Sequence, residues 1–245
     1  MDKLIIEVRK KHTKLFIGLL SYILISTAAI TLLFISNLST EKKLSLLLVV
    51  LIIMLVLAFW FKPRFYYYSQ QIKYLKLKKF QSPAIPIKNF SLNQSFINKL
   101  TKDAYQVFIE NDNYLMLHRY TQDPDEYVIK RPMLEILVFI KDVTISYQSD
   151  HISHMINLIE EDYEKKKIKY TNYSIIEIKY SKGIDESSIK EINQVTFDIE
   201  GGRHISVINV YINQVQNEAH FLHSDLFTPN MYYNYAINII KEILK

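Results

Sequence analysis

The chain has 245 residues and a formal net charge of +5, and it contains no cysteine and only four glycines. The lack of cysteine excludes disulfides, thiolate metal sites and a cysteine nucleophile. These four glycines, of which only two are close together, exclude a P-loop and a dinucleotide-binding fingerprint, because both need several glycines at a fixed close spacing. The abundance of Ile, Lys, Asn and Tyr is typical of an AT-rich, bacterial genome.

Two long apolar segments open the chain. Leu15 to Ile35 gives 21 residues without a charge and Leu44 to Phe61 gives 18, or about 31 Å and about 27 Å as helices. Both lengths suit the roughly 30 Å hydrocarbon core of a bilayer. The first segment is too long for a signal peptide, and no cleavage site follows it. We predict a two-helix transmembrane hairpin with a loop at residues 36–43.

The basic residues flank this hairpin unevenly. Five precede the first span, six follow the second between residues 62 and 80, and the loop holds two. The positive-inside rule therefore places both termini in the cytoplasm, and we expect a bacterial inner-membrane protein. Residues 81–245 carry 17 Lys and Arg against 22 Asp and Glu, a net charge of −5. This acidic balance disfavours nucleic acid as the partner of the domain.

The segment after the second span combines aromatic rings with cations. We expect it to contact the anionic cytoplasmic leaflet, through Trp60, Phe61, Lys62, Arg64, Lys73, Lys76, Lys78 and Lys79. Its apolar residues do not gather on one helical face, so the pattern does not predict an amphipathic helix. The small residues at 26–31 favour either packing against the second span or self-association of the spans. The predicted division is therefore an arm and hairpin at 1–61, a collar and Pro linker at 62–90, and a cytoplasmic domain at 91–245.

The domain pattern predicts an α+β fold with a mixed, largely antiparallel sheet and packed helices. A helix is expected to open at Ser91 through a capping box with Gln94. Next come a hairpin turning at residues 111–113, a buried central strand at 133–140 and a helix from Asp150. A strand at 173–180, a hairpin turning at residues 201–202 with Glu200 opposite Arg203, and a final helix capped by Thr228 complete the order.

Two groups of polar residues are candidates for chemistry. His220, His223 and Asp225 lie within six residues and would share a metal if the backbone turned there; otherwise they are surface polar groups. Glu177 and Lys179 share one face of a strand and match the Glu-x-Lys half of a nuclease signature, in which a further acid completes a Mg²⁺ site. A half-exposed strand shows the same pair without any such role.

No pattern identifies a cofactor or names a reaction. The leading hypothesis is a membrane-anchored interaction or regulatory protein that binds a protein partner or a small signal, with a defence or immunity role as one version. The alternatives are a membrane-tethered, metal-dependent hydrolase or nuclease, and a non-specific nucleic-acid binder that uses the basic segment.

Overall fold

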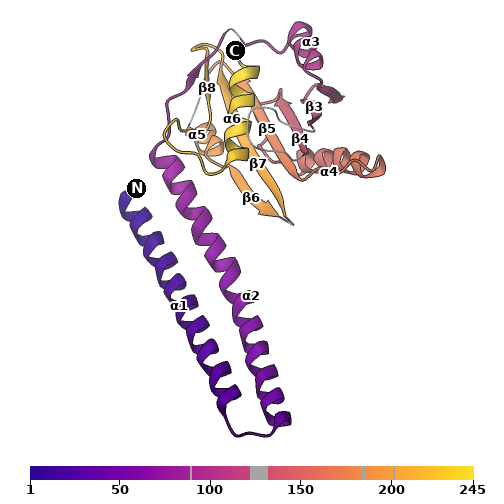
Figure 1. The fold of residues 1–245 in the computed structure, drawn as a ribbon. Helices are drawn as coiled ribbons and strands as arrows, with labels where there is room; N and C mark the ends of the chain where they lie inside the picture. The colour runs from indigo at the N-terminus through magenta and orange to yellow at the C-terminus, as the bar shows by residue number, and fades with distance from the viewer. Residues whose placement is uncertain (89, 122–131, 184–185, 201) are drawn as a thin grey trace. The chain divides into compact units, whose positions relative to one another are not determined.

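The computed structural model describes residues 1–88, 90–121, 132–183, 186–200 and 202–245. The chain forms two compact units, Met1–Lys79 and Phe80–Lys245 (Figure 1). The first unit is a pair of long helices, and the second is a sheet with helices packed on it.

The first unit consists of α1 (Asp2–Ile35) and α2 (Thr40–Lys79), which run antiparallel (Figure 1). The helices are about 51 Å and about 60 Å long. They pair along their whole length. The rings of His12 and Phe65 have centroids 4.1 Å apart, and Lys79 Nζ lies 2.5 Å from the Asp2 carboxylate.

The two helices are longer than the sequence predicted. The loop covers only residues 36–39, and α2 continues as helix through Pro63 and the whole basic segment to Lys79. Residues 62–79, for which the sequence predicted a basic collar and no amphipathic helix, are therefore the last part of α2. Extending an existing helix avoids the cost of nucleating a new one. Residues 62–79 also pack along α1, so they form a helix without an amphipathic pattern of their own.

The described residues of the second unit form an open eight-stranded sheet with the order β1-β8-β7-β5-β4-β3-β2, and β6 pairs with the same edge of β7 as β8 does. The strands are β1 (Ile85–Pro86), β2 (Gln106–Glu110), β3 (Tyr114–Thr121), β4 (Met133–Ile140), β5 (Asn172–Ser181), β6 (Thr196–Glu200), β7 (Arg203–Asn213) and β8 (Glu218–His220). The central pairs β4–β5 and β5–β7 are parallel and the flanking pairs are antiparallel. The predicted mixed sheet is thus confirmed, with a parallel centre.

Helices cover both faces of this sheet. They are α3 (Gln94–Lys102), α4 (Asp150–Lys165), α5 (Glu186–Ile192) and α6 (Met231–Ile243). Ile136 and Val138 of β4 belong to the same core cluster as Ile152 and Met155 of α4. The alternate residues of β4 point to the other face, where α6 lies; Met133 packs on Tyr232 there. All eight residues of β4 are buried, as expected for a central strand.

Several local predictions are confirmed. β2 and β3 form the predicted hairpin, α4 begins at Asp150, and Glu200 is paired with Arg203. Gly201 of the second predicted turn lies outside the described residues.

Two helix starts differ from the prediction. The N-cap of α3 is Asn93, whose Oδ1 accepts from the Phe96 N–H at 3.0 Å, and the N-cap of α6 is Asn230, whose Oδ1 accepts from the Tyr233 N–H at 2.8 Å. Sequence patterns find a capping residue only to within a few positions, because Ser, Thr and Asn all suit the role.

Candidate functional site

Glu177 and Lys179 lie on the same face of β5 and are both buried, with 1% and 2% of their surface exposed. β5 is central in the sheet, and the segment that leads into α4 covers this part of its face. Glu177 Oε2 accepts the backbone N–H of Gln148 at 2.8 Å. Lys179 Nζ donates to Glu191 Oε2 of α5 at 2.7 Å and lies 4.1 Å from the centre of the Tyr147 ring. Each charged group therefore has a partner inside the domain.

Burial governs the electrostatics of this cluster. It raises the pKa of Glu177 to about 7, although the Gln148 N–H and the Lys179 ammonium act in the opposite direction. Burial also raises the pKa of Tyr147 well above its usual range, and the Tyr147 hydroxyl donates to the Val210 carbonyl at 2.6 Å. The result is a buried acid–lysine cluster in which one carboxyl titrates near neutral pH.

The nuclease hypothesis needs another acid beside Glu177. Asp162, the nearest acid upstream in the sequence, is on α4, where it pairs with Lys166 at 2.6 Å. Within the described parts of the chain, no three His, Asp or Glu side chains gather closely enough to hold a metal ion. The structure thus places Glu177 and Lys179 in an internal network that joins β5 to α5.

In the histidine segment, His223 and Asp225 both contact Ser82, whereas His220 lies apart from them on β8. His220 ends β8, with its Nε2 at 3.6 Å from Glu218 Oε2. His223 is buried and stacks on Phe221 with ring centroids 4.4 Å apart. Burial lowers the pKa of both histidines. Asp225 is exposed; it accepts from Ser82 Oγ at 3.0 Å and pairs with Lys241 at 3.3 Å.

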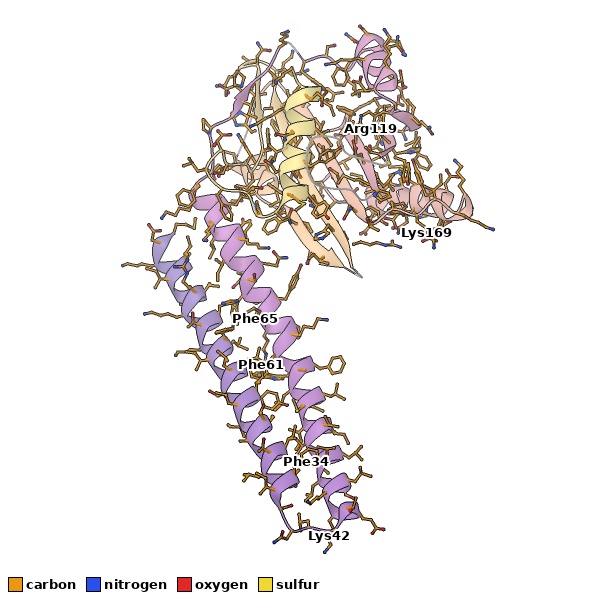
Figure 2. The ribbon with its side chains drawn as sticks, in the orientation of Figure 1. Phe34, Lys42, Phe61, Phe65, Arg119 and Lys169 are labelled. Atoms are coloured by element: carbon orange, nitrogen blue, oxygen red, sulfur yellow. The ribbon has the colours of Figure 1, made fainter. Side chains whose placement is uncertain are left out.

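A second buried carboxylate, Glu135, was not singled out from the sequence. Its Oε2 accepts from Tyr105 Oη at 2.7 Å and from Arg119 Nη2 at 2.7 Å, and its Oε1 accepts from Thr121 Oγ1 at 2.6 Å and from Tyr235 Oη at 2.8 Å (Arg119 is labelled in Figure 2). The donors come from β3, from α6 and from the residue before β2. The only sequence signal was one acid in an otherwise apolar strand, and the bonds indicate that it joins these elements.

The first unit exposes most of its apolar surface. Both helices are long and apolar enough to cross a membrane, and 6% and 0% of the residues in their most apolar 18-residue stretches are buried. Ser26 is buried, whereas Thr27 and Thr31 are exposed and donate to the carbonyls of Ile23 and Thr27 at 2.8 Å and 2.9 Å. The two threonine hydroxyls are thus satisfied within their own helix.

The paired ends of α1 and α2 form a basic stalk, which we define as residues 2–14 and 62–79. The stalk carries 11 Lys and Arg and two acids. The Arg64 guanidinium lies 3.6 Å from the centre of the Trp60 ring, and Phe61 meets the edge of that ring at a centroid distance of 5.0 Å. The structure therefore brings the N-terminal arm and the basic segment, at least 48 positions apart in sequence, together as one cationic surface.

Comparison with known proteins gives no match: no protein family, no curated protein and no solved structure resembles the chain significantly.

Proposed function

We propose that this chain is a membrane-anchored interaction or regulatory protein of a bacterial inner membrane. In this proposal α1 and α2 cross the bilayer as a hairpin, and the second unit binds a protein partner or a small signal in the cytoplasm. The observation that carries the proposal is the exposed apolar surface along both paired helices. A helix pair with this much uncovered apolar surface is stable in lipid and costly in water.

The charge of the hairpin supports an orientation. The stalk end holds 11 cations, and the opposite end holds Lys42 and Lys43 beside Glu41. Because positive residues are retained on the cytoplasmic side, the stalk and both termini belong there.

Helix length limits which cations meet the lipid. Lys62 and Arg64 directly follow the second span, at the level where Trp60 and Phe61 suit the headgroups. Lys73 lies about 18 Å beyond Phe61 along the helix and Lys79 about 27 Å. A tilt of about 40° still leaves Lys79 roughly 20 Å away, while the Debye length is about 8 Å. We therefore propose lipid contact for the first cations of the stalk, and a role away from the headgroups for Lys73 to Lys79.

The bonding inside the second unit favours binding over catalysis. Glu135, Glu177 and Lys179 are buried and engaged with other parts of the domain. A catalytic acid or base needs access to a substrate proton. The surface of the domain, with a net charge of −5 for residues 81–245, is left as the contact region for a partner or signal.

Single cysteines test this topology directly, because the chain has none of its own. Ser39→Cys places a thiol in the hairpin loop, and Leu226→Cys places one on a side chain that is 83% exposed in the second unit. In whole bacterial cells, a membrane-impermeant maleimide should label Ser39→Cys, and it should label Leu226→Cys only after permeabilisation. Labelling of Leu226→Cys in intact cells, or release of the chain from membranes by alkaline carbonate, would overturn the proposal.

A further inference from the structure

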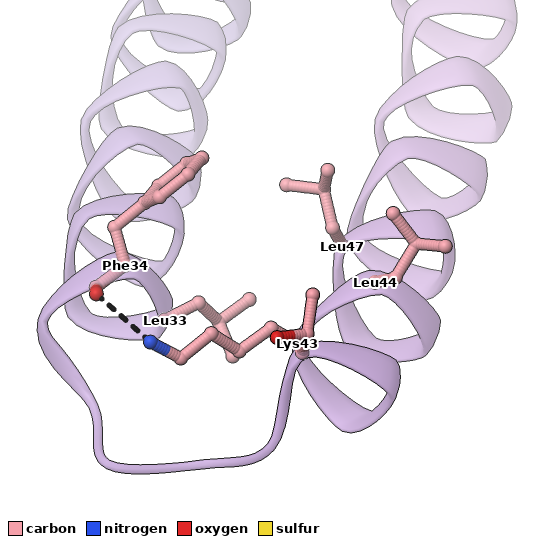
Figure 3. A pocket seen from close by; sticks show the side chains of 6 residues that line it. Leu33, Phe34, Lys43, Leu44 and Leu47 are labelled. Carbon is pink, nitrogen blue, oxygen red and sulfur yellow. Dashed lines mark hydrogen bonds between the residues drawn. The ribbon is translucent and has the colours of Figure 1, made fainter.

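A cavity of about 210 Å³ lies between α1 and α2 beside the hairpin loop. Figure 3 shows Phe34 and Leu47 pointing into the space between the two helices. The walls are almost entirely apolar, and the polar side chains, Thr40 and Lys43, come from the first turn of α2. The lining residues are Leu33, Phe34, Thr40, Lys43, Leu44 and Leu47.

Lys43 crosses the mouth of this cavity. Its Nζ donates to the Phe34 carbonyl at 3.1 Å, which satisfies a backbone group at the end of α1 (Figure 3). The adjacent end carbonyls are also bonded, since Ser36 donates to Leu32 through its N–H at 3.0 Å and to Leu33 through its Oγ at 2.8 Å. An ammonium has three donors, and the described contacts of Lys43 use one. Two N–H groups therefore remain available to an anion at the rim.

Water is a poor occupant for such a space. By its share of liquid volume, about 30 Å³ per molecule, the cavity has room for about seven waters, each of which needs two to four polar partners. The walls offer a hydroxyl and an ammonium. An apolar chain would pack against the leucines and the phenylalanine, while an attached anion would accept hydrogen bonds from the Lys43 ammonium.

We propose that this cavity binds a phospholipid, with part of one acyl chain against Leu33, Phe34, Leu44 and Leu47 and the phosphate at Lys43. The inference rests on the proposed membrane insertion, which puts the hairpin loop at the headgroup level of the leaflet opposite the termini. An acyl chain at this place fills the gap between the helices, and the phosphate neutralises a cation that also caps α1.

The test uses the full chain, extracted from membranes in a mild detergent and examined by native mass spectrometry for bound phospholipid. Three variants are compared with the parent chain. Lys43→Gln removes the cation, Leu47→Trp fills the cavity, and Lys42→Gln is the matched control, because it makes the same charge change at a residue that does not line the cavity. The parent and the three variants all carry Ser39→Cys, so that maleimide labelling reports insertion separately.

The parent and Lys42→Gln should retain one phospholipid, whose affinity Lys43→Gln lowers about tenfold, the effect of losing one charge-assisted hydrogen bond. Leu47→Trp should lose the lipid while it inserts normally. Equal retention in all four inserted chains, or equal loss in Lys42→Gln and Lys43→Gln, would overturn the proposal. If Leu47→Trp fails to insert, the pair of lysine variants decides the matter. Failure of the parent itself to insert would instead refute the membrane anchor.

Discussion

The Lys179 ammonium and the Glu191 carboxylate lie 2.7 Å apart, with 3% and 29% of their side-chain surfaces exposed. The pair connects the central strand β5 to the short helix α5. Asn209 of β7 reinforces the connection, since its Nδ2 donates to the Glu191 and Gln194 carbonyls at 2.9 Å and 3.0 Å. Polar bonds thus attach α5 to the sheet, beside the buried Ile192 side chain.

This pairing predicts that removing one of the two charges destabilises the domain more than removing both. Glu191→Gln leaves a buried ammonium without its counter-charge and should lower the free energy of unfolding by about 3 kcal/mol. The double variant Lys179→Met/Glu191→Leu should recover most of that loss. The measurement is thermal unfolding of the full chain in detergent, followed by near-ultraviolet circular dichroism of the tyrosines.

Asp162→Asn is the control for Glu191→Gln. The ion pair of Asp162 with Lys166 is exposed, and exposed pairs contribute about 0–1 kcal/mol to the free energy of unfolding. Similar losses for Glu191→Gln and Asp162→Asn would show that the burial of Lys179 does not matter.

The Glu135 cluster predicts a large effect of a nearly isosteric change. Glu135→Gln keeps the shape of the side chain but removes the charge that faces Arg119, and it turns one acceptor into a donor. We expect a loss of about 2–4 kcal/mol in unfolding free energy, measured as above.

Glu110→Gln is the matched control, since that carboxylate is 49% exposed and lies 3.5 Å from Lys141; its effect should stay within about 0.5 kcal/mol. An unchanged free energy of unfolding in Glu135→Gln would contradict the prediction and would mean that the four donor residues find other acceptors.

The raised pKa of Glu177 predicts a pH dependence. The folded chain holds this proton up to about pH 7, whereas the unfolded carboxyl releases it near 4.5. Between these values the folded state binds more protons, so this group makes stability fall as the pH rises. Glu177→Gln should remove that part of the slope.

The readout is the difference between the parent and Glu177→Gln in unfolding free energy from pH 4.5 to 7.5. Taking the difference cancels the contributions of the histidines, which titrate in the same range. A constant difference across this range would contradict the prediction.

The N-cap of α3 predicts which of two nearby residues, Ser91 or Asn93, contributes to the stability of the domain. Asn93→Ala removes the acceptor for the Phe96 N–H and should cost about 1 kcal/mol, whereas Ser91→Ala, at the start expected from sequence, should be nearly neutral. Comparison of the two melting temperatures decides between the caps. A larger effect at Ser91 would restore the capping box that the sequence suggested.

The sequence by itself determined the elements whose signal is local. Two uncharged segments of membrane length, the wholly apolar stretch at 133–140, the helical spacing from Ile152 to Tyr163 and the hairpin with Glu200 opposite Arg203 all depend on residues close together in the chain. Their patterns follow from the periods of helix and strand, and the structure shows these elements where they were expected.

Tertiary structure decided the polar partnerships. Glu135 binds Tyr105 and Tyr235, which are 30 and 100 residues away in sequence, and Lys179 finds Glu191 on a helix that no pattern predicted. The helical stalk also depends on its partner, because residues 2–14 run beside residues 62–79. Such contacts are set by which strands and helices become neighbours, and local periodicity carries no information about that choice.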